Sequence, residues 1–383
     1  MAIANTAAGL YLPDPWRWLP LAATALVAAA VWFGVPNRQF AQLSVEALKA
    51  RREEAFPRAE TQARAALAAA HRSHYRKPHL ICAGQELLSG ILLDQHKLDE
   101  AEQTARSLVA LYAEAGLTPL EHRPPERTLA HILLRAGKID EAETVLRRLQ
   151  EAFFFREHPL LRGAILSDLA ALESERGRAA RAAEWNTRAI HLLETHKAGD
   201  RELAVLHMNR GGNYSYAGDS SAALADYQKA LFLHERTEPE SVVTALLLSN
   251  AGVAELELGR PREAAKTLRR SVESWQRVAT PWDARFAMTC HILAEVLLAL
   301  NEFDEAAAYG LRSLQVKGGA EHADYPAFVL TLAGIRERQG RRPDAVQLLA
   351  EALPATERRA GANHEDTIRL KARLERLTAA VAA

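Results

Sequence analysis

Small and apolar positions recur along this chain at an interval that predicts paired helices. Segments such as LDEAEQTARSLV and FDEAAAYGLRSL share one alanine, and eight such alanines follow each other at intervals of 42, 41, 40, 41, 41, 42 and 39 residues. Most copies have a small residue twelve positions earlier, Gly or Asn five positions earlier, and an apolar residue eight positions later, where Gln150 is the one polar exception. The register alanines are Ala59, Ala101, Ala142, Ala182, Ala223, Ala264, Ala306 and Ala345.

Each column of this repeat has a physical interpretation. A small residue lets two helices approach closely, Gly or Asn adopts the left-handed conformation that ends a helix, and the apolar positions pack against the next copy. The pattern therefore predicts an all-α fold over residues 44–378, a right-handed superhelical solenoid of about eight antiparallel helix pairs. Leu370, Leu374 and Leu377 lie on one face of a further helix over 366–378, which we expect to cap the open end.

One copy carries enough of its residues to show a family resemblance. The run Gly211-Gly212-Asn213-Tyr214-Ser215-Tyr216-Ala217-Gly218, followed by Ala223, Tyr227, Ala230 and Leu231, resembles the tetratricopeptide (TPR) repeat. The long interval and His-containing connections such as Glu157-His158-Pro159 resemble the long-helix variant of kinesin light chain and its bacterial relatives. This resemblance implies a concave surface, lined mainly by the first helix of each pair, that binds a peptide or a partner protein.

The repeat register also selects candidate residues for that groove. Fourteen or fifteen positions before the register alanine lie Arg127, Asp168, Asn209, Asn250 and His291. The family often carries asparagines here that bond the backbone of an extended peptide, since an amide both donates and accepts. The alternative is that Asn209 and Asn250 cap or bridge neighbouring helices. The Lys and Arg positions of the carboxylate clamp in chaperone-binding members are not reproduced.

An uncharged segment precedes the repeats. Leu19 to Val35 is long enough to reach the lower limit of a membrane span, and Trp16, Trp18 and Trp32 flank it as interface residues do. We expect a tail over residues 1–15 and a transmembrane anchor over 16–36, with a cleaved signal peptide or a buried helix as alternatives. Basic residues after the segment favour a single-pass inner-membrane protein with its repeats in the cytoplasm, and a periplasmic orientation remains open.

Composition narrows the possible chemistry. The 48 Lys and Arg residues balance 48 Asp and Glu, so no basic surface for nucleic acid is expected. Cys82 and Cys290 are too far apart in a solenoid for a disulfide, and we interpret them as small apolar residues of first helices. His71, His74 and His79 lie close together but have no nearby thiolate or carboxylate. No phosphate-binding loop or nucleophile motif occurs, so we expect no catalytic residues, metal, cofactor or small-molecule substrate.

These observations predict a non-enzymatic scaffold or adaptor. It would be anchored in the membrane, bind a protein or an extended peptide in its concave groove, and aid the assembly or localisation of a membrane-associated complex. The alternative is an exported, periplasmic chaperone-like helper in envelope biogenesis.

Overall fold

The structure is a computed structural model that describes residues 38–52, 55–73, 77–116, 124–153, 158–278 and 283–382. These residues form seventeen α-helices and one short 3-10 helix, and no strand occurs among them. The helices are α3 (Arg38–Arg52), α4 (Phe56–Arg72), α5 (Lys77–Asp94), α6 (Leu98–Glu114), α7 (Pro125–Arg135), α8 (Ile139–Phe153), α9 (Pro159–Glu175), α10 (Ala179–Thr195), α11 (Asp200–Tyr216), α12 (Ser220–Glu235), α13 (Val242–Glu257), α14 (Pro261–Val278), α15 (Ala284–Ala299), α16 (Phe303–Ser313), η3 (Gly319–Glu321), α17 (Tyr325–Arg338), α18 (Arg342–Ala360) and α19 (Glu365–Ala382).

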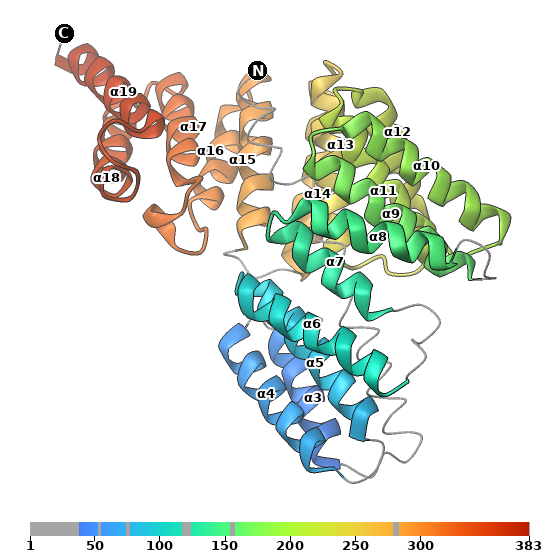
Figure 1. Cartoon of the computed structure of the whole chain (residues 1–383). Coiled ribbons are helices and arrows are strands. Elements are labelled where there is room, and N and C mark those ends of the chain that lie inside the picture. The colour runs from blue at the N-terminus through green and yellow to red at the C-terminus, as the bar shows by residue number, and fades with distance from the viewer. Residues whose placement is uncertain are drawn as a thin grey trace. The chain divides into compact units, whose positions relative to one another are not determined.

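Successive helices pack as pairs, and each pair packs on the next within its part of the chain. Helices α5 and α6 lie side by side in Figure 1, as do α17 and α18. Eight pairs, from α3 with α4 to α17 with α18, precede the last helix, which confirms the predicted all-α repeat fold. The chain divides between Ala198 and Gly199 into two compact units. We call them the N-terminal unit, with α3–α10, and the C-terminal unit, with α11–α19, and we describe each by itself. The right-handed superhelical course stays a prediction.

The repeat register matches burial residue by residue. All eight register alanines are fully buried, and the small residues twelve positions earlier are buried as well. Close packing is the reason, as two glycines of first helices show. A Cβ on Gly211 would lie 2.8 Å from Cε1 of Tyr227, and one on Gly252 would lie 2.7 Å from Cγ of Leu268. A larger side chain at either position would force the packed side chain of Tyr227 or Leu268, or the helix that carries it, to shift.

The turn between the two helices of a pair repeats one backbone conformation. Gly137 and Gly218 have φ angles of 72° and 80°, a backbone conformation that residues other than glycine adopt with difficulty. Asn301 takes the same left-handed conformation with φ 62°, as predicted for that column. His96, which departs from the sequence column, also adopts it with φ 57°. The repeat geometry therefore imposes this conformation even where the sequence offers neither Gly nor Asn.

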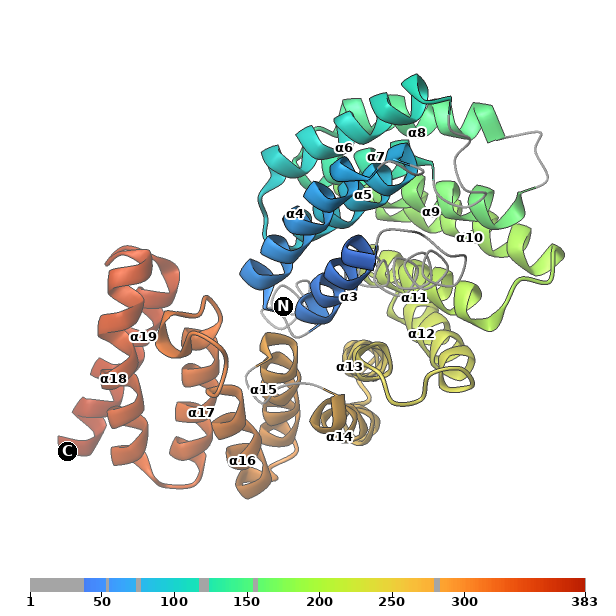
Figure 2. The ribbon, with the colours of Figure 1, turned by 90° about the horizontal axis from the view of Figure 1, so that it is seen from below.

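The predicted capping helix is present as α19. Leu370 and Leu377 are buried, and Leu374 packs against them beside residues of α17 and α18. Figure 2 shows α17, α18 and α19 together. The apolar stripe of α19 covers the last pair, and its other positions are largely exposed. This is the arrangement that a repeat array needs at its end.

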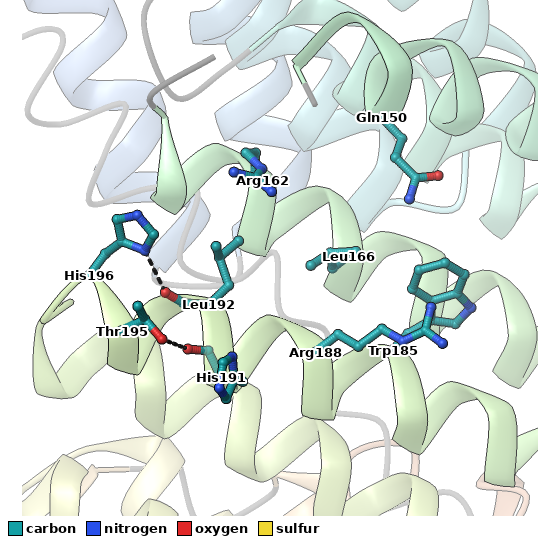
Figure 3. A pocket seen from close by; sticks show the side chains of 9 residues that line it. All are labelled: Gln150, Arg162, Leu166, Trp185, Arg188, His191, Leu192, Thr195 and His196. Carbon is teal, nitrogen blue, oxygen red and sulfur yellow. Dashed lines mark hydrogen bonds between the residues drawn. The ribbon is translucent and has the colours of Figure 1, made fainter. Parts of the chain in front are cut away.

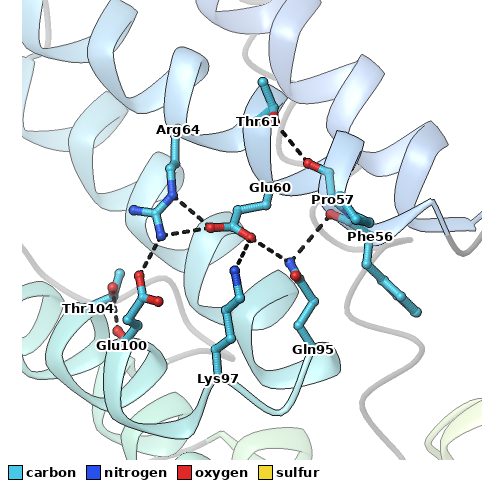
Figure 4. A network of polar contacts seen from close by, with 9 residues as sticks. All are labelled: Phe56, Pro57, Glu60, Thr61, Arg64, Gln95, Lys97, Glu100 and Thr104. Atoms are coloured by element: carbon cyan, nitrogen blue, oxygen red, sulfur yellow. Dashed lines mark hydrogen bonds and ion pairs between the residues drawn. The ribbon is translucent and has the colours of Figure 1, made fainter.

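A ladder of ion pairs joins second helices in the N-terminal unit. Its first rung centres on Glu60 of α4, which accepts hydrogen bonds from Lys97 (2.7 Å), Arg64 (2.9 Å) and Gln95 (2.9 Å). Arg64 also donates to Glu100 of α6 at 2.6 Å (Figure 4). The hydrogen bond from Lys97, together with those from Arg64 and Gln95, lowers the pKa of Glu60 to about 2. The carboxylate thus stays charged and links two adjacent repeats.

The same rung recurs one repeat later. Glu102 of α6 accepts from Lys138 at 2.9 Å and from Arg106 at 2.9 Å, and Arg106 donates to Glu141 of α8 at 2.5 Å. Because these residues occupy the same register positions as those of the first rung, the repeat organises surface charge as well as core packing.

The predicted anchor lies outside the described residues. Residues 16–36 and the tail over 1–15 are not among the residues that the structure describes. Among the helices that it describes, none combines the length and apolar character needed to cross a bilayer.

Candidate functional site

The five predicted groove residues all lie on first helices, but they fall in different units. Arg127 on α7 and Asp168 on α9 belong to the N-terminal unit, whereas Asn209 on α11, Asn250 on α13 and His291 on α15 belong to the C-terminal unit. The structure brings the first two into contact and leaves the polar atoms of Asn250 without partners. Their predicted role in partner binding stays a prediction.

Arg127 and Asp168 form a buried ion pair between two repeats. Nε of Arg127 donates to Asp168 Oδ2 at 2.6 Å and Nη2 donates to Oδ1 at 3.1 Å. His131, which the sequence analysis missed, donates from Nε2 to Asp168 Oδ1 at 3.0 Å. Burial by itself would raise the pKa of Asp168, but the charges of Arg127 and His131 lower it to about 2. The carboxylate is thus ionised and already engaged within the chain.

A similar cluster lies beside Asn209 in the C-terminal unit. Asp226 of α12 accepts from Arg210 Nε at 2.6 Å and from His207 Nδ1 at 2.8 Å. Burial opposes ionisation here too, yet Arg210 and His207 hold the pKa of Asp226 below its ordinary value. Nε2 of His207 is buried without a hydrogen bond. Asn209 itself is half-buried between these two residues of α11.

Asn250 is the most unusual of the five residues. Its side chain is fully buried, and neither Oδ1 nor Nδ2 has a hydrogen-bond partner. Every residue of α13 from Val243 to Ala254 is buried, so the amide has no exposed helix face beside it. A buried amide without partners lowers stability by about 1–3 kcal/mol for each group left unsatisfied. Because this amide lowers the stability of the fold, its presence has to be explained by something other than stability, such as a role in binding.

The residue next to Asn250 has the opposite environment. Ser249 Oγ donates to the carbonyl of Ala245 at 3.0 Å and lies 2.7 Å from Ser271 Oγ and 2.9 Å from Thr289 Oγ1. Trp275 Nε1 lies 3.4 Å from the same oxygen. This cluster joins α13, α14 and α15, and no pattern along the chain predicts it. The hydroxyl group of Ser249 is therefore fully hydrogen-bonded, whereas the amide of the adjacent Asn250 has no hydrogen bond.

His291 is buried on the following first helix. Its Nδ1 has no hydrogen-bond partner, and Nε2 lies 3.7 Å from Glu295 Oε1. The ring packs against Phe328 of α17 with a centroid separation of 5.0 Å. Burial lowers the pKa of His291, so the neutral imidazole is favoured. Glu295 also accepts from Thr331 Oγ1 at 3.2 Å, which places a carboxylate beside the buried ring.

Other chemistry is weakly represented in the described chain. Cys82 and Cys290 are free and buried on α5 and α15, as expected for small apolar residues. Burial raises the pKa of the Cys82 thiol to about 11 and that of Cys290 to about 12. No group of three or more metal-ligating side chains occurs within the described ranges. His71 and His79 belong to those ranges, whereas His74 does not.

Comparisons with known proteins agree with the repeat register. Residues 202–277 match the family model described as tetratricopeptide repeat, and this match contains both Asn209 and Asn250. The comparison with curated proteins found no match.

Solved structures resemble the fold over most of the chain. A signal transduction ATPase with numerous domains and a tetratricopeptide repeat sensor, from Pyrococcus horikoshii, has a TM-score of 0.62 at 10% identity, covering 90% of this chain and 53% of that one. A Rap protein complexed with competence and sporulation factor has a TM-score of 0.50 at 15% identity, covering 91% and 99%. The apo quorum sensor NprR from B. thuringiensis has a TM-score of 0.50 at 17% identity, covering 77% and 79%.

At these identities the resemblance concerns the fold. The narrower resemblance to kinesin light chain stays a prediction. Together, the repeat register, the family match and the paired helices support a TPR-type helical repeat protein.

Proposed function

We propose that this chain is a peptide-binding or protein-binding repeat protein, and that its ligand contacts the first helices α11, α13 and α15 around Asn209, Asn250 and His291. The observation that carries the proposal is the buried amide of Asn250, whose donor and acceptor both lack partners. An extended peptide backbone offers one acceptor and one donor per residue, which is the complement of a side-chain amide.

Two further observations support this proposal. The Rap protein was solved as a complex with competence and sporulation factor, and NprR is described as a quorum sensor. Both share the fold that this chain adopts, and the match to the repeat family covers the helices that carry Asn209 and Asn250. Because Asn250 is enclosed, binding in this mode requires the surface over α13 to open.

The proposal makes stability and binding respond in opposite directions. Asn250→Leu removes two unsatisfied polar groups and replaces them with an apolar side chain of similar size. We expect its free energy of unfolding to rise by about 1 kcal/mol, because nothing in the folded chain bonds the amide. We expect peptide binding to fall at least tenfold.

The test uses linear heptapeptides selected from a random phage-displayed library on the whole chain, labelled with fluorescein and followed by anisotropy. Asn209→Ala and Asn250→Leu should each weaken binding at least tenfold. Gln347→Ala should not, because that exposed amide lies on second helix α18 and bonds Glu351. Hydrogen exchange in α13 should change when peptide binds. Equal affinity for Asn250→Leu and the native chain, or no enriched peptide, would contradict the proposal.

The predicted absence of enzymatic activity and the tethering by residues 16–36 stay predictions. The peptide proposal depends on neither, because it concerns only the C-terminal unit.

A further inference from the structure

A pocket of the N-terminal unit offers a second candidate site. A surface pocket of about 400 Å³ lies among α8, α9 and α10 (Figure 3). Its lining residues are Gln150, Arg162, Leu166, Trp185, Arg188, His191, Leu192, Thr195 and His196. The volume is within the range of about 300–1,000 Å³ that is usual for small-molecule sites.

The lining separates into an apolar part and a cationic part. Leu166, Leu192 and Trp185 are half-buried and supply apolar surface. Arg162 and Arg188 supply positive charge, and among the described residues that line the pocket there is no aspartate or glutamate. Gln150 also contributes, and it is the polar exception in a column that is otherwise apolar. A ligand that matches this lining has an apolar body and an anionic group.

Arg188 contacts the aromatic ring of Trp185. Its guanidinium carbon lies over the Trp185 ring, 4.7 Å from the ring centroid, which is a cation–π contact. A cation–π contact supplies no hydrogen-bond acceptor atom, so the guanidinium keeps N–H donors that a carboxylate can bind. In Figure 3 the Arg188 side chain extends along α10 to Trp185 at the edge of the pocket. Because this contact restricts the Arg188 side chain before a ligand binds, the side chain loses less conformational entropy when it binds a carboxylate.

Other second helices of the unit pair their arginines differently. Arg64, Arg106 and Arg147 occupy one register position on α4, α6 and α8, and each forms an ion pair with the glutamate four residues earlier. On α10 the ladder stops, because Ala183 replaces the glutamate and Thr187 replaces the arginine.

Arg188, the next residue, pairs with no carboxylate of the described chain and instead lies over the Trp185 ring. The interruption of the ladder coincides with the pocket. A cation without an acidic partner, beside apolar surface, is the arrangement expected of an anion-binding site rather than of a structural ion pair.

We propose that this pocket binds a carboxylate attached to an aromatic or other apolar body. The apolar body packs on Trp185, Leu166 and Leu192, and the carboxylate accepts hydrogen bonds from the edge of the Arg188 guanidinium. A free inorganic anion lacks the apolar contact, and a neutral aromatic molecule lacks the ionic one. The same chemistry occurs in a free aromatic acid and in the C-terminal residue of a peptide.

Four small probe molecules separate the contribution of the carboxylate to binding from that of the aromatic ring. Phenylacetate carries both groups, acetate only the anion, phenylacetamide only the ring, and phenethylamine the opposite charge. Isothermal titration calorimetry on the whole chain should give phenylacetate a dissociation constant at least tenfold lower than any of the other three. A peptide ending in a free phenylalanine, compared with its C-terminal amide, then distinguishes the peptide source from the free acid.

Variants of α10 test the assignment of residues. Arg188→Gln and Trp185→Phe should weaken phenylacetate binding, the first at least tenfold. Arg181→Gln is the matched control, because Arg181 is an exposed arginine of the same helix outside the pocket. Circular dichroism verifies that each variant is folded. Equal affinity for phenylacetate and phenylacetamide, unchanged affinity in Arg188→Gln, or no binding at millimolar concentration would overturn the proposal. Because the site lies in the N-terminal unit, its failure leaves the peptide proposal untouched.

Discussion

The N-terminal and C-terminal units each bury one aspartate between an arginine and a histidine, but the two clusters join different parts of the fold. Asp168 on α9 binds Arg127 and His131, both on α7, so it connects the first helices of two successive repeats. Asp226 on α12 binds His207 and Arg210 of α11, so it connects the two helices of one repeat. The two clusters contain the same residue types, but the first links two repeats and the second links the two helices of one repeat.

This difference concerns how a repeat array holds together. The stability of such an array is approximately the sum of the stability of each repeat and the interaction between neighbours. Asp168 contributes to the interaction between neighbouring repeats, and Asp226 contributes to the stability of a single repeat. We therefore expect the loss of Asp168 to uncouple repeats, and the loss of Asp226 to weaken one repeat locally.

The largest expected effect follows from removing each carboxylate. Asp168→Ala and Asp226→Ala leave buried cations without a partner, which lowers the free energy of unfolding by about 3–5 kcal/mol. Asp168→Ala should also split the urea transition of the N-terminal unit, since helices on either side of the α7–α9 contact lose their coupling. Asp226→Ala should instead raise hydrogen exchange in α11 and α12. A single transition and a loss below about 1 kcal/mol for Asp168→Ala would contradict this view.

An intermediate effect is expected from pH. The pKa of Asp168 is about 2 in the folded chain and 3.8 in the reference state. Because the folded value is the lower one, the stabilisation is complete above about pH 5 and is lost as the pH falls through 2. A shift of this size corresponds to about 2.5 kcal/mol.

Urea unfolding between pH 6 and pH 2.5 measures this contribution against Asp168→Asn, which cannot ionise. The difference in stability between the native chain and the variant should shrink as the pH falls. Asp226→Asn should follow the same sign, because the pKa of Asp226 is also lowered. A difference that does not depend on pH would show that ionisation of Asp168 is not what stabilises the contact.

The smallest effect is expected from the surface ladder. Glu102→Gln breaks the ion pairs with Lys138 and Arg106, which are half-exposed, so the loss should be about 0.5–1 kcal/mol and should decrease in high salt. Glu151→Gln is the matched control, an exposed glutamate of α8 that pairs with no described cation. Thermal unfolding at low and high salt measures both. If salt did not change the loss of stability caused by Glu102→Gln, Glu102 would stabilise the chain through packing and not through its charge.

Much of the fold could be predicted because its signals are local and repeated. A column of small residues is enough to predict close packing of two helices, and all eight register alanines are buried. His96 shows the limit of this argument. Its column predicts Gly or Asn, yet the repeat geometry places His96 in the same left-handed turn.

Side-chain networks were harder to predict, because their members are distant in sequence. His207 and Arg210 share a face of α11 at i, i+3 spacing, a signal that the sequence contains. Their partner Asp226 lies on the next helix, and only the packing of α12 brings it to them. Ser249, Ser271 and Thr289 likewise come from three helices. Nothing along the chain distinguishes Ser249, which is fully bonded, from its neighbour Asn250, which is not.

The helix pairs, their turns and the capping helix could be predicted from the residues along the chain, because helical periodicity and close packing act within one repeat of about forty residues. Which polar groups have hydrogen-bond partners depends on the packed fold, because the side chains that form these bonds come from separate helices. The packed fold leaves Asn250 without a bond and places Arg188 over Trp185 instead of pairing it with an acid. Both proposed sites rest on those two outcomes of packing.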